Sequence, residues 1–429
     1  MSMPVWIIIP FVCQILIIAI APLVCERWWA INRNKLAVSL VVSVPTTIFM
    51  YANRMGGKIE HQILYDYLPF IIYLCALFVI TGGIHLGGDL VSRPLVNTAF
   101  LGIGYILAAF MGTTGAAMLL IRPLLTANRQ RQFKTHTVLF FIAAVANCGG
   151  LIMPLGDPPL FLLYLRGVEF TWFLHLLPEW TFVGVMLLTI YYFADCYYFK
   201  KENWAAISAD MREKTPIHIK GNVNFALLLG VVAAVAFVNP QNFTSMTNSN
   251  APLYFKFLRE IILVFLIFLS LILTQKTVRR QNKFTWKPIA EVAAIFLGIF
   301  ITITPVLQFL NEHARSLPLT KTWHFYYATG ALSAFLDNAP TALAFHSIAQ
   351  GLPLQGNEIA GISEILLKAI AAGAVFFGAM TYIGNAPNFM IKAIAEENRV
   401  NMPSFFAYIL KFSLAVLLPI YILTQLLFL

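Results

Sequence analysis

The stretch GGLIMPLGDPPLF, from Gly149 to Phe161, places an aspartate and two consecutive prolines inside a long apolar run. A helix cannot continue unbroken through Pro158 and Pro159, because proline lacks a backbone N–H and its ring clashes with the preceding turn. An ionised Asp157 near the centre of a bilayer costs about 2.5–3.5 kcal/mol on insertion scales. The stretch therefore predicts a broken membrane helix whose acidic side chain is compensated by another part of the fold.

Hydrophobic residues make up 59% of the 429 residues and charged residues only 11%, whereas a soluble domain carries about 25% charged residues. Apolar runs of about 20 residues, each long enough to cross the hydrocarbon core, recur from end to end. The composition therefore predicts an all-α polytopic membrane protein. The first run lacks a basic leading segment and a clear cleavage site, so we interpret it as a membrane span rather than a signal peptide.

The apolar runs divide into two halves with the same order of elements: three spans, an interrupted run, a broken helix and a last span. Each part of an interrupted run is too short to cross alone, which predicts a re-entrant hairpin. The layout predicts about 10 full spans plus two hairpins. Its segments are a first half at 1–198 with a hairpin at 97–125 and a broken helix at 137–165, a cytoplasmic linker at 199–222, and a second half at 223–429 with a hairpin at 325–347 and a broken helix at 365–391.

The basic residues are distributed unevenly about this layout. If both hairpins return to the side from which they entered, most of the Lys and Arg residues in loops fall on one side of the membrane. Such loops are cytoplasmic by the positive-inside rule. The net charge of +10 therefore reflects membrane orientation rather than nucleic-acid binding. Both termini are predicted to face outward, in a multi-pass protein of the bacterial inner membrane.

An internal duplication relates the two halves. AAFMGTTGAAML, which starts at Ala108, aligns with SAFLDNAPTALA, and PLGDPPLF aligns with YIGNAPNF. The second alignment pairs Gly156 with Gly384 and Asp157 with Asn385. Because the first half starts outside and the second inside, the halves are predicted to be inverted repeats. Such repeats in transporters place the binding site near the midplane, where half-helices end.

The candidate site residues are the polar side chains at the four breaks, which offer hydroxyl, amide and carboxylate oxygens. They are Thr113, Thr114, Asp157, Asp337, Asn338, Thr341, Asn385 and Asn388. Oxygen ligands suit hard cations, whereas an organic anion favours Arg, Lys or neutral donors, and no Lys or Arg lies inside a break. Burial penalises the charged form of a carboxyl group, and a bound cation or proton offsets that penalty. Asp157 and Asp337 are therefore predicted to bind Na⁺ and H⁺ in turn.

Each candidate also has a purely structural interpretation. Asp337 precedes Asn-Ala-Pro and can be a helix N-cap, and Asp157, next to a proline, can be a turn residue. The hydroxyl groups of Thr113 and Thr114 can bond to the backbone instead of an ion.

Three other polar residues in apolar runs have two interpretations each. Asn147 can be a ligand or an interhelical hydrogen-bonding residue. Glu291 ranks below the aspartates as a site candidate, and it lies close enough to Lys287 in the sequence to form an interfacial ion pair. His346 fits a packed side chain better than a proton relay.

The segments SAFLDNAPTALAF, TYIGNAPNFMIKAIAEE and KPIAEVAAIFLGIFITITP resemble the ion transporter superfamily, and the resemblance covers nearly the whole chain. Within it they are similar to NhaD-type sodium/proton antiporters and to the citrate-transport branch. Anion symporters of this superfamily carry Ser-Asn-Thr at both hairpin tips and Gly-Thr-Pro-Pro-Asn in the first broken helix. This chain departs from that pattern at both tips and has Asp157 in place of the threonine. The resemblance implies a scaffold domain, a mobile transport domain with an elevator motion, and a homodimer.

These patterns favour a secondary antiporter that exchanges Na⁺, with Li⁺ as a second candidate ion, for H⁺. The ions are cargo, and no cofactor is expected. The alternative is a cation-coupled citrate or dicarboxylate symporter, in which the aspartates hold only the coupling ion. An enzyme is not expected, because HExxH and GxSxG motifs are absent from the sequence. The five cysteines form no CxxC pair, and no phosphate-binding P-loop occurs.

Overall fold

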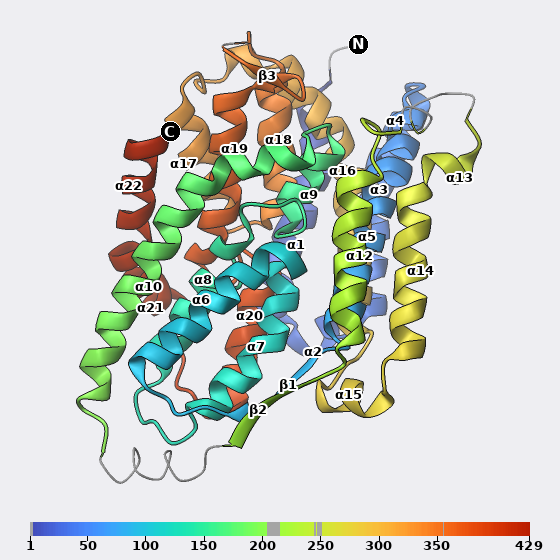
Figure 1. Ribbon diagram of the computed structural model, residues 1–429. Coiled ribbons are helices and arrows are strands. Elements are labelled where there is room, and N and C mark those ends of the chain that lie inside the picture. Colours follow the sequence, from blue (N-terminus) through green and yellow to red (C-terminus); the bar gives the residue numbers. More distant parts are fainter. Residues whose placement is uncertain (1–2, 204–214, 244–245, 247–250, 355) are drawn as a thin grey trace.

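A computed structural model describes residues 3–203, 215–243, 246, 251–354 and 356–429. Most of these residues are helical, and the C-terminus lies toward the end of the bundle opposite β1, β2 and α15 (Figure 1). Six helical stretches are long and apolar enough to cross a membrane: Asn32–Ala52, Gly56–Thr81, Pro94–Met111, Phe170–Phe199, Lys287–Glu312 and Phe405–Phe428. The predicted all-α polytopic class is confirmed, while the count of ten full crossings stays a prediction.

The first half runs from η1 to α10. Its elements, in chain order, are η1 (Val5–Ile8), α1 (Ile9–Val24), α2 (Glu26–Trp29), α3 (Asn32–Ala52), α4 (Gly56–His61), the π-helix η2 (Gln62–Tyr67), α5 (Leu68–Thr81), β1 (His85–Asp89), α6 (Pro94–Met111), α7 (Thr113–Ala127), α8 (Thr135–Ala144), η3 (Cys148–Gly150), α9 (Pro158–Leu165), η4 (Phe170–Leu176) and α10 (Leu177–Phe199). The predicted linker 199–222 follows, and its residues 204–214 lie outside the described residues.

The second half continues from the end of that linker. Its elements are β2 (Thr215–Lys220), α12 (Val223–Phe237), α13 (Leu253–Lys256), α14 (Leu258–Leu273), α15 (Lys276–Gln281), α16 (Lys287–Glu312), η6 (Ala314–Ser316), α17 (Thr322–Ser333), α18 (Asn338–Gln350), β3 (Glu358–Ile359), β4 (Ile362–Ser363), α19 (Glu364–Phe377), η7 (Gly378–Met380), α20 (Ala386–Glu397), α21 (Phe405–Tyr408), the π-helix η8 (Ile409–Leu417) and α22 (Leu418–Phe428).

Helices are interrupted within all four predicted segments. In the first interrupted run α6 ends at Met111 and α7 begins at Thr113, with Gly112 between them at φ 77°, in the left-handed region that favours glycine. The two helices pack against each other as a hairpin whose open ends lie at the same end of the bundle (Figure 1). However, α6 has 18 residues and is long enough to cross, so the expectation that each part is too short is wrong for α6.

The two broken helices have nearly the same backbone geometry. Asp157 has φ −146° and ψ 146°, Asn385 has φ −146° and ψ 139°, and each precedes a helix with proline in its first turn. A glycine precedes each of them, and a Cβ at Gly156 or Gly384 would lie 1.9 or 2.7 Å from a carbonyl oxygen six residues earlier. These matching features support the proposed duplication.

An alanine at Gly156 is expected to lower the thermal stability of the protein, because its Cβ would lie 1.9 Å from the carbonyl oxygen of Gly150. Overpacking of a tightly packed site typically costs about 1–3 kcal/mol. Gly57 in α4 is the matched control, since no atom lies within 4 Å of a Cβ there and alanine favours a helix over glycine. Thermal unfolding in detergent measures both variants, and equal melting temperatures would contradict the tight contact between the backbones.

Helices from the two halves pack against each other around the breaks. The half-helix α9 packs against α18, and α7 packs against α20. All four of these helices begin at a break, so their N-terminal ends approach the same region. On one side of this region α5 and α16 provide a wall, and α16 packs along α3.

The packing of α16 on α3 decides the partner of Glu291. Its carboxylate lies 2.6 Å from the Nζ atom of Lys35 in α3. The pairing of Glu291 with Lys287 that we considered from the sequence is therefore wrong. The contact between α3 and α16 brings in a lysine that is distant in the sequence.

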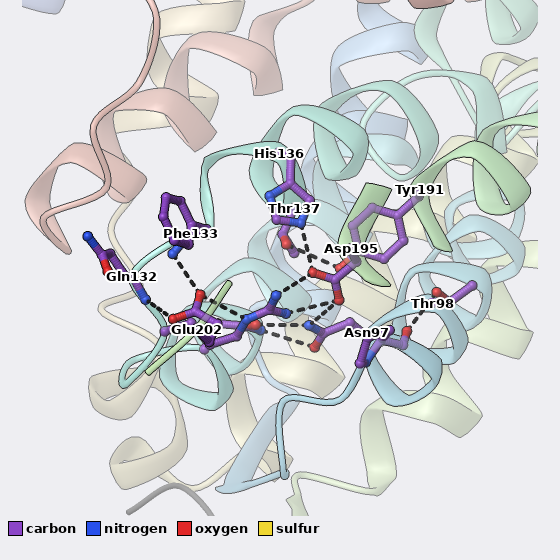
Figure 2. A network of polar contacts seen from close by, with 12 residues as sticks. Asn97, Thr98, Gln132, Phe133, His136, Thr137, Tyr191, Asp195 and Glu202 are labelled. Carbon is purple, nitrogen blue, oxygen red and sulfur yellow. Dashed lines mark hydrogen bonds and ion pairs between the residues drawn. The ribbon is translucent and has the colours of Figure 1, made fainter. Parts of the chain in front are cut away.

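A buried network of ion pairs and hydrogen bonds links the loop between α7 and α8 to the C-terminal end of α10 (Figure 2). The Asp195 carboxylate is completely buried and lies 2.7 Å from a nitrogen of Arg131 and 2.7 Å from Nε2 of His136. Asn97 in α6 donates a further hydrogen bond to Asp195 at 3.3 Å. Glu202 accepts hydrogen bonds from the backbone N–H groups of residues 132 and 133 at 2.9 and 2.8 Å. The network anchors this end of α7 and, with it, the hairpin.

Candidate ion site at the helix breaks

The Asp157 carboxylate lies where the four breaks meet, and it is completely buried. Thr113 at the first hairpin tip donates its hydroxyl hydrogen to Oδ1 at 2.6 Å. Asn385 of the second broken helix donates to the same oxygen at 3.2 Å, and Asn338 at the second hairpin tip donates to Oδ2. Side chains from three breaks therefore converge on the carboxylate of the fourth. These donors are the compensation that an acid inside an apolar run requires.

Backbone contacts hold the first hairpin tip against the broken helix. The Thr113 N–H group donates to the carbonyl oxygen of Gly156 at 2.8 Å. From the other side, the Tyr73 hydroxyl in α5 donates to the carbonyl oxygen of Leu155 at 2.6 Å, and its ring stacks on Phe161 at 3.9 Å between centroids. Hydrogen bonds thus hold both of the residues that directly precede Asp157.

The stabilisation of Asp157 comes from neutral groups. Its hydrogen-bond partners among the described residues are one hydroxyl group and two amides. In addition, α9 begins directly after Asp157, and the positive end of a helix dipole favours a negative charge. A buried polar group is tolerated when it is hydrogen-bonded, and no cationic side chain in the described part of the chain supplements these bonds.

Asp337 combines the structural role that we considered with a position at a cavity. Its Oδ1 accepts from the Ala339 N–H group at 3.1 Å, which caps α18. Its side chain is half-buried, and it lines a cavity beside the breaks. Capping therefore accounts for one oxygen of Asp337 without removing the side chain from the site.

The cavity lies between the breaks and the wall formed by α5 and α16. It contains about 690 Å³ of empty space, part of which is open to solvent. Its polar part is lined by Thr113, Thr114, Asp337 and Asn385. Two helices line most of its apolar part: α5 with Phe70, Tyr73, Leu74, Leu77 and Phe78, and α16 with Pro288, Ile289, Val292 and Phe296. None of the described residues that line it is Lys, Arg or His.

Thr341 and Asn388 lie near the site, but the hydroxyl group of the first and the amide nitrogen of the second donate to backbone carbonyl groups of the second half. The Thr341 hydroxyl donates to the carbonyl oxygen of Asp337 at 3.0 Å. The Asn388 amide donates to the carbonyl oxygens of Gly378 and Thr381 at 2.8 and 2.9 Å. Further along α18, His346 is buried, and its Nε2 has no hydrogen-bond partner in the part of the chain that the structure describes.

Sequence reasoning left two contributors to the site undecided or unseen. Asn147 is completely buried and bonds to both Asn385 and Asn388, which the polarity of the AANCGG segment signalled only in general terms. Tyr73 could not be singled out, because a tyrosine in an apolar span has no distinguishing pattern in the sequence. The helices α5 and α16 could not be assigned to a cavity for the same reason.

Comparison with known proteins identifies the family. A family model described as "Putative citrate transport" matches residues 1–429. A comparison with curated proteins found no match. The match agrees with the resemblance to the citrate-transport branch of the ion transporter superfamily, and it makes the protein a multi-pass membrane transporter. Because the match extends over the whole chain, the protein belongs to this citrate-transport family.

Proposed function

We propose that the protein is a secondary transporter that exchanges Na⁺ for H⁺, with Asp157 and Asp337 binding the cation and the proton in turn. The observation that carries the proposal is that Asp157 is completely buried with only neutral hydrogen-bond donors as partners among the described residues. Burial penalises the charged form of a carboxyl group in this setting, and a bound small cation or a proton offsets that penalty.

Other buried carboxylates of the same chain show what a structural role looks like. Asp66, Asp195 and Glu260 are each at most 4% exposed, and each forms an ion pair with an arginine at 2.8, 2.7 and 2.5 Å. Buried charges are ordinarily paired in this way. Among the described residues Asp157 forms no such ion pair, and neither does Glu179 in α10, which is 1% exposed. Of these two, Asp157 lies where four helices begin, which favours a role in ion binding.

The groups around Asp157 suit a hard cation. The Oδ1 atom of Asn338 is buried without a hydrogen-bond partner in the described part of the chain. An amide oxygen, a hydroxyl oxygen from Thr113 and a carboxylate oxygen are ligands of the type that Na⁺ and other hard cations take. Asp337 provides a second carboxylate at the cavity beside the breaks.

The same proposal includes the cellular setting. The charge distribution of the loops favours the bacterial inner membrane with both termini outside, and the resemblance favours a homodimer with a mobile transport domain. The inverted duplication belongs to the proposal as well, and the matching geometry of the two broken helices supports it.

Cation-coupled citrate symport is the second candidate, and two observations favour it. The family description names citrate, and helix N-termini such as those at the four breaks favour anions. In this case the aspartates hold only the coupling ion, and Thr113 and Asn385 contribute donors to the anion. The absence of Lys, Arg and His from the described lining of the cavity weighs against it.

Purified protein in liposomes that contain a pH-sensitive dye separates the two candidates. A pulse of Na⁺ without any organic acid is expected to move protons out of the liposomes, and Li⁺ and K⁺ pulses give the ion selectivity. Liposomes without protein are the control. Proton movement that occurs only when citrate is also present would reject the exchange and support symport.

A further inference from the structure

Three asparagines from the two halves form a chain of side-chain amides that ends at Asp157. It starts at Asn388, whose Nδ2 donates to the carbonyl oxygens of Gly378 and Thr381. With its nitrogen committed to these carbonyl groups, Asn388 can offer only its Oδ1 atom to the next amide. That atom accepts from Nδ2 of Asn147 at 2.8 Å.

The hydrogen bonds of Asn147 fix its own orientation and, through its Oδ1 atom, the orientation of Asn385. Its Nδ2 also donates to the carbonyl oxygen of Ile142 at 2.8 Å, so its Oδ1 is left as an acceptor. Nδ2 of Asn385 lies 3.1 Å from this oxygen, 3.3 Å from the carbonyl oxygen of Ala146 and 3.2 Å from Oδ1 of Asp157. The three atoms around the Asn385 nitrogen are all acceptors.

The chain therefore has one direction. An amide side chain has a donor end and an acceptor end, and reversing any of the three would set oxygen against oxygen. Asn147 and Asn388 are completely buried and Asn385 is 2% exposed, so a lost hydrogen bond here would cost the full desolvation penalty. Fixed backbone carbonyl groups thus determine which end of Asn385 faces Asp157.

The other amide at Asp157 is not constrained in this way. Asn338 donates to Oδ2 of Asp157, while its Oδ1 has no hydrogen-bond partner in the described part of the chain. Reversing this amide breaks only its own hydrogen bond to Asp157, and a cation bound between the two oxygens would replace that contact. The two amides that contact the carboxylate therefore differ in whether they can present oxygen to an ion.

We propose that Asn147 is a positioning residue that keeps the amide nitrogen of Asn385 directed at Asp157. In this arrangement Asn385 is a permanent donor to the carboxylate, and Asn338 is the amide that turns its oxygen toward the transported cation. The inference rests on the proposed cation site at Asp157. Asn385 is then the fixed hydrogen-bond donor, Asn147 the residue that positions it, and Asn338 the cation ligand.

The test compares the KM for Na⁺ of four proteins in liposomes: the wild type, Asn147→Ala, Asn385→Ala and the double variant. A carboxylate that lacks one donor competes less well for Na⁺ against H⁺, so each single variant is expected to raise the KM by about tenfold at acidic pH. The increase is expected to shrink as protons become scarce. Because Asn147 acts through Asn385, the double variant should match Asn385→Ala alone.

Two further variants separate positioning from general damage. Asn338→Ala removes a ligand, so it is expected to raise the KM at every pH. Asn224→Ala is the matched control, because Asn224 is a completely buried amide in α12 that bonds to the carbonyl oxygen of Gly83, away from the breaks. It is expected to leave the KM unchanged. A wild-type KM in Asn147→Ala, or effects of the two single variants that multiply in the double variant, would overturn the inference.

Failure of the proposed function gives a different result from failure of this inference. A wild-type protein without Na⁺-driven proton movement rejects the exchange itself. The same four proteins are then compared in citrate uptake with Na⁺ as the variable. Equal KM values for the double variant and Asn385→Ala support the positioning role there, and multiplied effects reject it.

Discussion

Replacing Asp157 by asparagine is expected to lower Na⁺-driven proton movement by roughly 100-fold, since hydrogen bonds to a charged group contribute about 1.5–3 kcal/mol. Asparagine keeps the shape of the side chain but removes the charge that a cation or proton neutralises. Its amide nitrogen would also face the donors that now surround the carboxylate, from Thr113, Asn338 and Asn385. Flux in liposomes, normalised to folded protein by gel filtration, measures the loss.

Exchanging the residues at the two broken helices tests whether the position of the charge matters. The double variant with Asp157→Asn and Asn385→Asp keeps one carboxylate at the breaks, and it is expected to remain as inactive as the single variant. Position 157 is surrounded by donors, whereas position 385 faces two acceptors, the carbonyl oxygen of Ala146 and Oδ1 of Asn147. Flux above a tenth of the wild-type value would contradict this asymmetry.

The helix breaks could be predicted because their causes are local. Proline cannot continue a helix, and the sequences GDPP and GNAP place proline in the first turn of α9 and α20. Gly112 marks the first hairpin tip through its positive φ. The sequence does not show that the four breaks lie close together in space, because the hydrogen-bond partners of Asp157 are up to 228 positions away in the chain. Their convergence depends on how α7, α9, α18 and α20 pack.

The strand pair near the end of α5 illustrates a different limit. β1 and β2 pair antiparallel, with His85 opposite Lys220, and join two loops that connect distant helices. HLGGD shows no strand periodicity, and TPIHIK alternates apolar and polar residues only over its last four positions. Pairing between segments so far apart in the chain is a property of the assembled fold, so no local pattern predicts it.

The walls of the cavity could not be separated from lipid-facing surfaces by hydropathy. Phe70 and Phe296 line the cavity and are at most 6% exposed, whereas Phe265 and Phe268 on α14 are 60 and 58% exposed. All four lie in apolar spans of similar composition. Only the packing of α5 and α16 against the breaks assigns the first two to the site, because a bilayer and a protein interior both favour such side chains.

Removing the Asp195 carboxylate is expected to have the largest effect on stability. Asp195→Ala leaves Arg131 buried after the loss of its contacts at 2.9 and 2.7 Å, and it also removes the acceptor for His136 (Figure 2). Deleting one partner of a buried ion pair costs about 3–5 kcal/mol where the remaining charge is uncompensated. We expect the lower part of this range, because Glu202 remains 3.6 Å from Arg131. Thermal unfolding in detergent is expected to show a large drop in melting temperature.

The matched control for Asp195→Ala is Glu396→Ala, because Glu396 forms an ion pair of the same 2.7 Å length with Lys392 but has a side chain that is 45% exposed. Exposed pairs contribute only about 0–1 kcal/mol, so this variant should unfold close to the wild-type temperature.

Since the network around Asp195 anchors the α7–α8 connection and makes no hydrogen bond to Asp157 in the described part of the chain, the KM for Na⁺ of the folded Asp195→Ala protein should stay unchanged. A loss of stability no larger than that of Glu396→Ala would mean that the buried network adds no stability beyond that of a surface pair.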